Sequence, residues 1–282
     1  MTGRALACDR SGHGPALVLL HGFTGNSGSM AGLARDLGND FDVIVPDLPG
    51  HGRSVDRASL PKYDFDACVE DLVATLDAAG RRPAHWLGYS MGARLALGCA
   101  VRHPSRVASL VLLAGRAGIR EPGERSARRA ADEALAARIE ARGVEPFVDD
   151  WLAQPLFATM QRLGPQFMAR ERSARLANDA TGLASSLRAL GPAAQPPLFD
   201  ALPRVTVPVL LMAGALDARF VAAAHELACG LPRAEVCVIP GAGHAVHLEQ
   251  PGACLRVVHE FLRRVERPAS HDPSSSIQEI VP

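Results

Sequence analysis

Short apolar runs alternate with helical patterns through most of the chain. Six of these runs are rich in Val, Leu and Ile and show little polar alternation, which predicts strands buried on both faces. The runs are 16–20, 42–46, 84–89, 107–115, 207–214 and 234–240. Helical periodicity marks 66–79 and 91–103. This order predicts an α/β fold with a mostly parallel central sheet flanked by helices.

The alternation stops between residues 116 and 202. This stretch has no convincing strand and many arginines and alanines, with helix-like pieces separated by "EPG", "LGP" and "AQPP". Ligands of α/β proteins bind at the carboxyl edge of the sheet, so we expect 116–202 to form a helical cap over that edge. Residues 1–115 and 203–266 then form the core. The Pro- and Ser-rich stretch 267–282 is expected to be a disordered tail.

Composition narrows the class of protein. The 282 residues carry 30 basic and 30 acidic side chains, which predicts no nucleic-acid partner. There is no apolar run of membrane-spanning length, no signal peptide pattern, and the six cysteines lack metal spacing. No phosphate-binding glycine loop or metal motif is present either. We therefore expect a cytoplasmic protein with no cofactor and no metal, as a monomer or small homo-oligomer.

The segment "GYSMG", Gly88 to Gly92, fits the G-x-S-x-G pattern of a nucleophile elbow. A predicted strand runs directly into it and a predicted helix runs directly out, as such a turn requires. This geometry would raise the Ser90 hydroxyl above the sheet at a helix N-terminus, where developing negative charge is favoured. The context predicts a functional Ser90.

A serine hydroxyl needs a histidine to take its proton, and the histidine needs an acid to hold its tautomer. His244 lies in the glycine-rich "GAGHAVHLEQP" after the last strand, and Asp217 follows the strand 207–214. The order Ser90, Asp217, His244 is that of α/β-hydrolases. The local rivals are His247, which we expect to begin a helix, and Asp200, which no strand positions.

An oxyanion hole would complete this site. It needs the backbone N–H after the nucleophile, which belongs to Met91, and a second N–H from the loop after an early strand. The loop "HGFTG" supplies the second, with Phe23 as the expected donor.

Several stretches carry a family resemblance. "LVLLHGFTGN", "VIVPDLPGHGRS", "GYSMGARLAL" and "GAGHAVHLEQP" resemble the α/β-hydrolase superfamily across residues 15–265. Within it, "GYSMGAR" and the cap stretches 124–139, 147–160 and 175–202 resemble the 2-succinyl-6-hydroxy-2,4-cyclohexadiene-1-carboxylate synthases of menaquinone biosynthesis. The segment "LLAGRAGI" departs from that family, which usually has a serine or small residue followed by Pro-Gly.

The resemblance implies a lyase. That family removes a proton next to a ketone and expels pyruvate from a cyclohexene that bears several carboxylates. The chemistry is consistent with the triad, because a serine polarised by a histidine can act as a base and an oxyanion hole can stabilise an enolate. The partner is then a small polycarboxylate.

Carboxylates call for guanidinium partners. Arg94 lies four residues after Ser90, on the same face of the predicted helix. The resemblance implies that Arg128 and Arg175 bind substrate from the cap. Arg128 also lies within about 40° of the apolar stripe formed by residues 127, 131, 135 and 139, given about 100° per helical residue. A helix-edge residue with a solvated head group is the alternative for Arg128.

Two aromatic residues complete the expected site. Trp151 fits either a pocket wall or the core of the cap. Tyr89 is expected to pack at the elbow, with a hydroxyl that could reach a ligand.

Two other functions remain open on the same triad. A serine hydrolase of carbon–carbon bonds or small esters would use water as the second reactant. A non-catalytic receptor on the same fold is disfavoured by the intact Ser90, Asp217 and His244.

The abundance of arginine limits what any single arginine shows. Lys62 is the only lysine among the 30 basic residues, so a functional role for one arginine needs support from its position.

Overall fold

A computed structural model describes residues 3–56, 63–81, 83–267 and 279–280. Its strands form one eight-stranded sheet in the order β1-β3-β2-β4-β5-β6-β7-β8. All neighbouring strands are parallel except β1, which runs antiparallel to β3. The strands are β1 Cys8–Gly12, β2 Ala16–Leu20, β3 Asp42–Pro46, β4 Ala84–Tyr89, β5 Val107–Leu113, β6 Val209–Gly214, β7 Ala234–Ile239 and β8 Glu279–Ile280.

The helices fill the intervals between strands. They are α1 Ala31–Leu37, α2 Phe65–Ala78, α3 Met91–Arg102, α4 Pro122–Arg142, α5 Val144–Leu152, α6 Pro165–Leu176, α7 Ala180–Leu190, α8 Ala218–Gly230, α9 Val246–Glu249 and α10 Pro251–Glu266. Short 3₁₀ helices cover Ser27–Met30, Gly52–Ser54, Pro104–Arg106, Pro155–Leu163 and Phe199–Arg204.

The sheet is buried on both faces, as its apolar strands predict. Successive side chains of a strand point to opposite faces. Val18 and Leu20 accordingly pack in one core with α2, α3 and α8, whereas Leu17 and Leu19 pack in a second core with α1 and α10. The three-layer α/β architecture expected from the sequence is confirmed.

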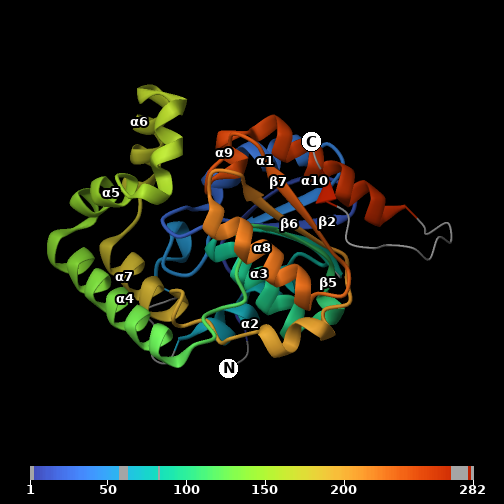
Figure 1. The fold of residues 1–282 in the computed structure, drawn as a ribbon, viewed down its shortest axis with the longest axis horizontal. Coiled ribbons are helices and arrows are strands. Elements are labelled where there is room, and N and C mark those ends of the chain that lie inside the picture. Colours follow the sequence, from blue (N-terminus) through green and yellow to red (C-terminus); the bar gives the residue numbers. More distant parts are fainter. Residues whose placement is uncertain (1–2, 57–62, 82, 268–278, 281–282) are drawn as a thin grey trace.

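The segment from α4 to α7 leaves the sheet after β5 and returns before β6, its neighbour in the sheet. Figure 1 shows these helices on one side of the sheet-containing part of the molecule. They share a cluster of their own, which includes Ile139, Phe147 and Leu183. The helices occupy the interval that the sequence assigns to a cap, and 116–202 contains no strand.

Two local features differ from the sequence expectations. β1 was not expected, because its residues "CDRSG" are polar and mostly exposed and carry no apolar signal. The buried face of α4 includes Asp132, Ala136 and Ile139 rather than the stripe through residues 127 and 131, which are exposed alanines. Alanine buries too little surface to set the facing of a helix.

The expected disorder of 267–282 falls almost wholly outside the described residues. Glu279–Ile280 differ from that expectation, because they form a short parallel strand beside β7.

The turn between β4 and α3 is the most constrained backbone near the site. Ser90 has φ 52° and ψ −104°, an unfavourable conformation for a residue with a side chain. A Cβ at Gly88 would lie 2.3 Å from the carbonyl oxygen of Gly92, and a Cβ at Gly92 would lie 2.3 Å from that of Leu20. Only glycine allows α3 to approach β2 this closely.

We expect Gly92→Ala to lower the free energy of unfolding by about 3 kcal/mol or more, because backbone rather than a flexible side chain blocks the new Cβ. Urea unfolding measures the change. The control is Gly32→Ala in α1, where a Cβ meets nothing within 4 Å and a gain of about 0.5–1 kcal/mol is expected. Equal stability of the two variants would contradict the close approach.

Candidate active site

Three side chains meet at the carboxyl edge of the sheet. The Nε2 atom of His244 lies 3.2 Å from Ser90 Oγ, and its Nδ1 atom lies 2.9 Å from Asp217 Oδ2. With the proton on Nδ1 directed to Asp217, Nε2 is the acceptor for the serine hydroxyl. Asp217 is held in place because it caps α8, accepting the Phe220 N–H at 3.3 Å. His244 can accept the hydroxyl proton of Ser90, and the Ser90 oxygen can in turn take a proton from a ligand.

A buried carboxylate that the sequence reading missed fixes the loop of His244. Glu249 accepts the N–H of Gly243 at 2.9 Å and the N–H of Ala245 at 3.1 Å, one on each side of the histidine. Its place in the short α9, which follows the loop directly, brings it back onto the loop. In the sequence, the only sign of this role was that Glu249 follows His244 by five residues.

The rival residues, His247 and Asp200, are not part of the Ser90–His244–Asp217 arrangement. His247 belongs to α9, where burial and the nearby His244 lower its pKa to about 3, so it is neutral. Tyr89 packs between the two histidines, with ring centroids 5.4 Å from His244 and 4.5 Å from His247. Burial raises the pKa of Tyr89. Asp200 lies in the 3₁₀ helix Phe199–Arg204, away from the pocket lining.

The two amides expected to form an oxyanion hole are available. Within the described ranges, the N–H groups of Phe23 and Met91 donate to no other backbone group. The loop of Phe23 is held by His51, whose Nε2 accepts the Thr24 N–H at 3.2 Å. Burial lowers the pKa of His51 to about 3, so its ring stays neutral and can accept this bond. Thr24 itself has φ 71°, so the loop is a constrained turn.

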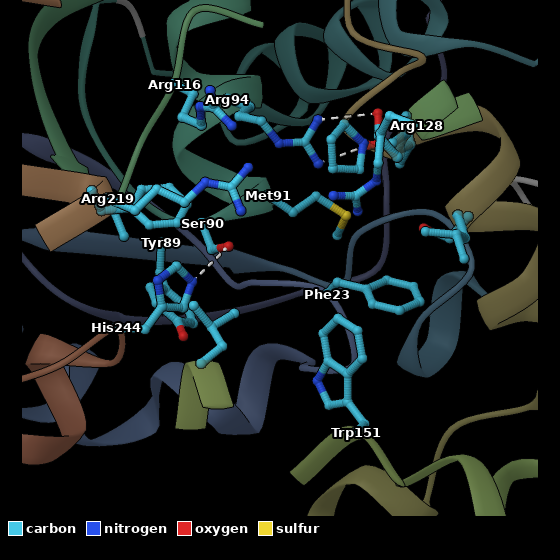
Figure 2. A pocket seen from close by; sticks show the side chains of 18 of the residues that line it. Phe23, Tyr89, Ser90, Met91, Arg94, Arg116, Arg128, Trp151, Arg219 and His244 are labelled. Carbon is cyan, nitrogen blue, oxygen red and sulfur yellow. Dashed lines mark hydrogen bonds between the residues drawn. The ribbon is translucent and has the colours of Figure 1, made fainter. Parts of the chain in front are cut away.

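These groups open onto one pocket between the sheet edge and the helical segment (Figure 2). Aromatic and aliphatic side chains form much of its wall, with Phe23 and Trp151 close together at 5.4 Å between ring centroids. Four of its lining residues are arginines, namely Arg94, Arg116, Arg128 and Arg219. Among the described residues that line it, none is acidic. The charge of the pocket lining therefore favours an anionic ligand.

Arg94 and Arg128 occupy expected positions in this lining. Arg94 is 9% exposed and donates to the carbonyl oxygens of Leu190 at 2.8 Å and Gly191 at 3.4 Å, at the C-terminus of α7. Burial and the charge of Arg128 lower its pKa to about 10. Arg128 forms an ion pair with Asp132 at 2.7 Å, one turn along α4. Each cation thus also stabilises the helical segment that roofs the pocket.

Arg116 and Arg219 were not singled out from the sequence. Arg116 follows β5 by three residues, and Arg219 follows Asp217 by two. Because β5 and β6 are neighbours, both arginines leave the same edge of the sheet. Their positions just after strands could have indicated a role at the sheet edge, but arginine is so common in this chain that these two did not stand out.

Arg175 does not line the pocket in this structure, contrary to the expectation carried by the resemblance. Its Nη1 atom binds Glu171 Oε2 at 2.6 Å and the Glu171 carbonyl at 2.9 Å within α6. An acidic residue one turn away pairs with Nη1 of the guanidinium, whereas its buried Nε atom has no hydrogen-bond partner among the described residues. Trp151 lines the pocket and also packs on Phe147 and Phe157, so its two expected roles coincide.

The described residues offer neither a metal centre nor a membrane-spanning helix. No group of three or more His, Cys, Asp or Glu side chains in them could hold a metal ion. No helix in the described part of the chain is long and apolar enough to cross a membrane.

Comparison with known proteins identifies the family. Residues 15–251 match the model of the alpha/beta hydrolase fold. The chain is 39% identical over 250 residues to a Bacillus subtilis (strain 168) protein named as a candidate 2-succinyl-6-hydroxy-2,4-cyclohexadiene-1-carboxylate synthase, covering 89% of this chain and 91% of that protein. It is 33% identical to the synthase of Enterobacter sp. (strain 638), covering 88% and 92%.

The chain belongs to the 2-succinyl-6-hydroxy-2,4-cyclohexadiene-1-carboxylate synthase family. Its structure agrees, since MenH from S. aureus superimposes with a TM-score of 0.87 at 30% identity, over 93% of this chain and 98% of that one. An esterase from Thermogutta terrifontis, solved with malate bound, follows with a TM-score of 0.81 at 28% identity, over 93% and 94%. The synthase family is thus a lyase family on a hydrolase fold.

The role of Glu249 in this synthase-family site can be tested with Glu249→Gln. An amide oxygen can accept one of the two loop N–H groups, but its NH₂ group opposes the other. We expect the free energy of unfolding to fall by about 1–3 kcal/mol. We also expect the downfield proton NMR signal of the His244–Asp217 hydrogen bond to weaken.

The matched control is Glu260→Gln, an exposed position on α10. Should Glu249→Gln retain both the stability and the NMR signal of the parent chain, Glu249 does not position the histidine.

Proposed function

We propose that the protein is a carbon–oxygen lyase of menaquinone biosynthesis. It would convert 2-succinyl-5-enolpyruvyl-6-hydroxy-3-cyclohexene-1-carboxylate to 2-succinyl-6-hydroxy-2,4-cyclohexadiene-1-carboxylate and pyruvate. The names of the relatives support this reaction. The observation that carries the proposal is the set of four arginines around Ser90 and His244 in a pocket whose described lining holds no carboxylate.

The charge of the pocket fits the substrate. The substrate bears a ring carboxylate, a succinyl carboxylate and an enolpyruvyl carboxylate, and guanidinium groups pair with carboxylates through two parallel hydrogen bonds. Burying cations is costly unless an anion compensates them. A neutral acyl ester would leave Arg116 and Arg219 without a partner, whereas a polycarboxylate could pair with them.

Proton abstraction falls to Ser90 and His244. As Ser90 Oγ takes the proton from the ring carbon next to the succinyl ketone, its own hydroxyl proton passes to His244 Nε2 across 3.2 Å. Asp217, 2.9 Å from Nδ1, stabilises the imidazolium that forms. The C–H electron pair moves toward the ketone, giving an enolate.

The enolate oxygen is the group that the oxyanion hole would stabilise. The free amides of Phe23 and Met91 are the expected donors. Return of the electron pair shifts the ring double bond and breaks the bond between the ring carbon and the enolpyruvyl oxygen. The fragment leaves as the enolate of pyruvate and takes up the proton held on His244. One C–H and one C–O bond break, a conjugated diene forms, and the triad returns to its starting state.

Hydrolysis of a small ester or carbon–carbon bond is the second candidate. The same triad geometry serves it, and the malate-bound esterase with a related structure favours it. The two functions differ in what the arginines do. For the lyase they are part of substrate binding, whereas an esterase for neutral esters does not need them.

Pyruvate release from the enolpyruvyl cyclohexene carboxylate tests the proposal. We expect release coupled to the appearance of an absorbing conjugated diene, and Ser90→Ala should reduce kcat by about 10²–10⁴-fold because the base is lost. Turnover of p-nitrophenyl acetate is measured in parallel. A simple ester consumed much faster than pyruvate is released would favour the hydrolase.

Arg94→Ala tests the pocket cations. We expect kcat/KM for pyruvate release to fall by an amount equal to about 2–4 kcal/mol, since a buried charge partner of the substrate is lost. Arg102→Ala is the control, because Arg102 lies on the same helix but is exposed and pairs with Asp66. If both variants turn over substrate like the parent chain, Arg94 has no binding role.

A further inference from the structure

Two of the four pocket cations have no protein partner. Within the described ranges, the guanidinium groups of Arg116 and Arg219 form no hydrogen bond or ion pair with a protein group, whereas Arg94 and Arg128 each have one. Many other arginines in the described part of the chain are paired, for example Arg188 with Glu133 and Glu140. Other described arginines without such a partner, for example Arg35 and Arg170, are exposed on the surface, whereas Arg116 and Arg219 line the pocket.

The sheet brings these two cations together. Arg116 comes from the segment after β5, and Arg219 from the first turn of α8 after β6. β5 and β6 are adjacent and parallel, with Leu113 opposite Met212 at their carboxyl ends. Figure 2 shows the side chain of Arg219 extending over the pocket on the side of Ser90 and His244, with Arg116 above it.

The protein relieves the repulsion on Arg116 only in part. Burial, followed by the charges of Arg219 and Arg128, lowers the pKa of Arg116. Glu124 and Glu226 act on it in the opposite sense, but neither carboxylate is within ion-pair distance of it among the described residues. Arg116 is half-buried, whereas Arg219 is exposed, so the unfavourable charge falls mainly on Arg116, and a bound anion would offset it.

We propose that Arg116 and Arg219 form a second carboxylate-binding subsite, on the core wall of the pocket beside Ser90 and His244. It would take one carboxylate of a polycarboxylate ligand while Arg94 and Arg128, at the helical segment, take another. This inference rests on the proposed function for the substrate class. The two subsites together would select ligands with at least two carboxylates.

Isothermal titration calorimetry with propane-1,2,3-tricarboxylate tests the subsite without relying on turnover. We expect Arg116→Ala and Arg219→Ala each to weaken binding about 10–100-fold, the scale of a hydrogen-bonded charge pair. Arg116→Lys and Arg219→Lys keep the charge but lose the two parallel hydrogen bonds, so their affinities should lie between those of the alanine variants and the parent chain. Arg256→Ala, at an exposed position of α10, is the matched control and should bind unchanged.

Kinetics supplies the second readout. In the pyruvate-release assay, the two alanine variants should raise KM about tenfold or more while kcat changes less than about threefold, because a binding contact and not the base is lost. Urea unfolding checks that all variants fold. Folded alanine variants with parent-like affinity and KM would overturn the subsite, and so would a parent chain that does not bind the tricarboxylate.

Failure of the proposed function has a different signature. A parent chain that releases no pyruvate, yet binds the tricarboxylate in a manner dependent on Arg116 and Arg219, would refute the lyase and support the subsite. Pyruvate release that is insensitive to both alanine substitutions would support the lyase and refute the subsite.

Discussion

The close approach of α3 to the sheet is the constraint on which the site depends. Gly92 packs against the Leu20 carbonyl and Gly88 against Gly92, and the turn between them holds Ser90 at φ 52°. This one turn sets the Ser90 hydroxyl, the free amide of Met91 and, one helical turn later, Arg94. A residue that relaxed the turn would therefore displace the Ser90 hydroxyl, the Met91 amide and a pocket cation together.

In the pocket, Ser90 and His244 are surrounded by arginine side chains. His244 is 2% exposed and fixed on both sides by the amides that Glu249 binds. The arginines come from separate parts of the chain: the elbow helix, the sheet edge and the helical segment. An anion bound among them would therefore contact both the sheet edge and the helical segment.

Local patterns were enough to predict the sheet and the neighbourhood of Ser90, because buried parallel strands are continuous apolar runs and the elbow is a strand–turn–helix. What they missed depends on contacts distant in sequence. Arg116 and Arg219 meet only because β5 and β6 are neighbours across the inserted segment. Arg175 was expected in the pocket, but a glutamate one turn away holds it. The polar β1 gave no signal because it is an edge strand that joins the sheet through its pairing with β3.

The central claim is that a serine–histidine base acts on carbon while surrounding arginines hold the carboxylates of its substrate. A crystal structure of the protein with 2-succinyl-6-hydroxy-2,4-cyclohexadiene-1-carboxylate bound tests it most directly. The account predicts that the carboxylate oxygens lie about 2.7–3.2 Å from guanidinium nitrogens of the pocket and that the ketone oxygen faces the amides of Phe23 and Met91. Guanidinium groups turned to solvent, with the ligand's carboxylates bound elsewhere, would contradict it.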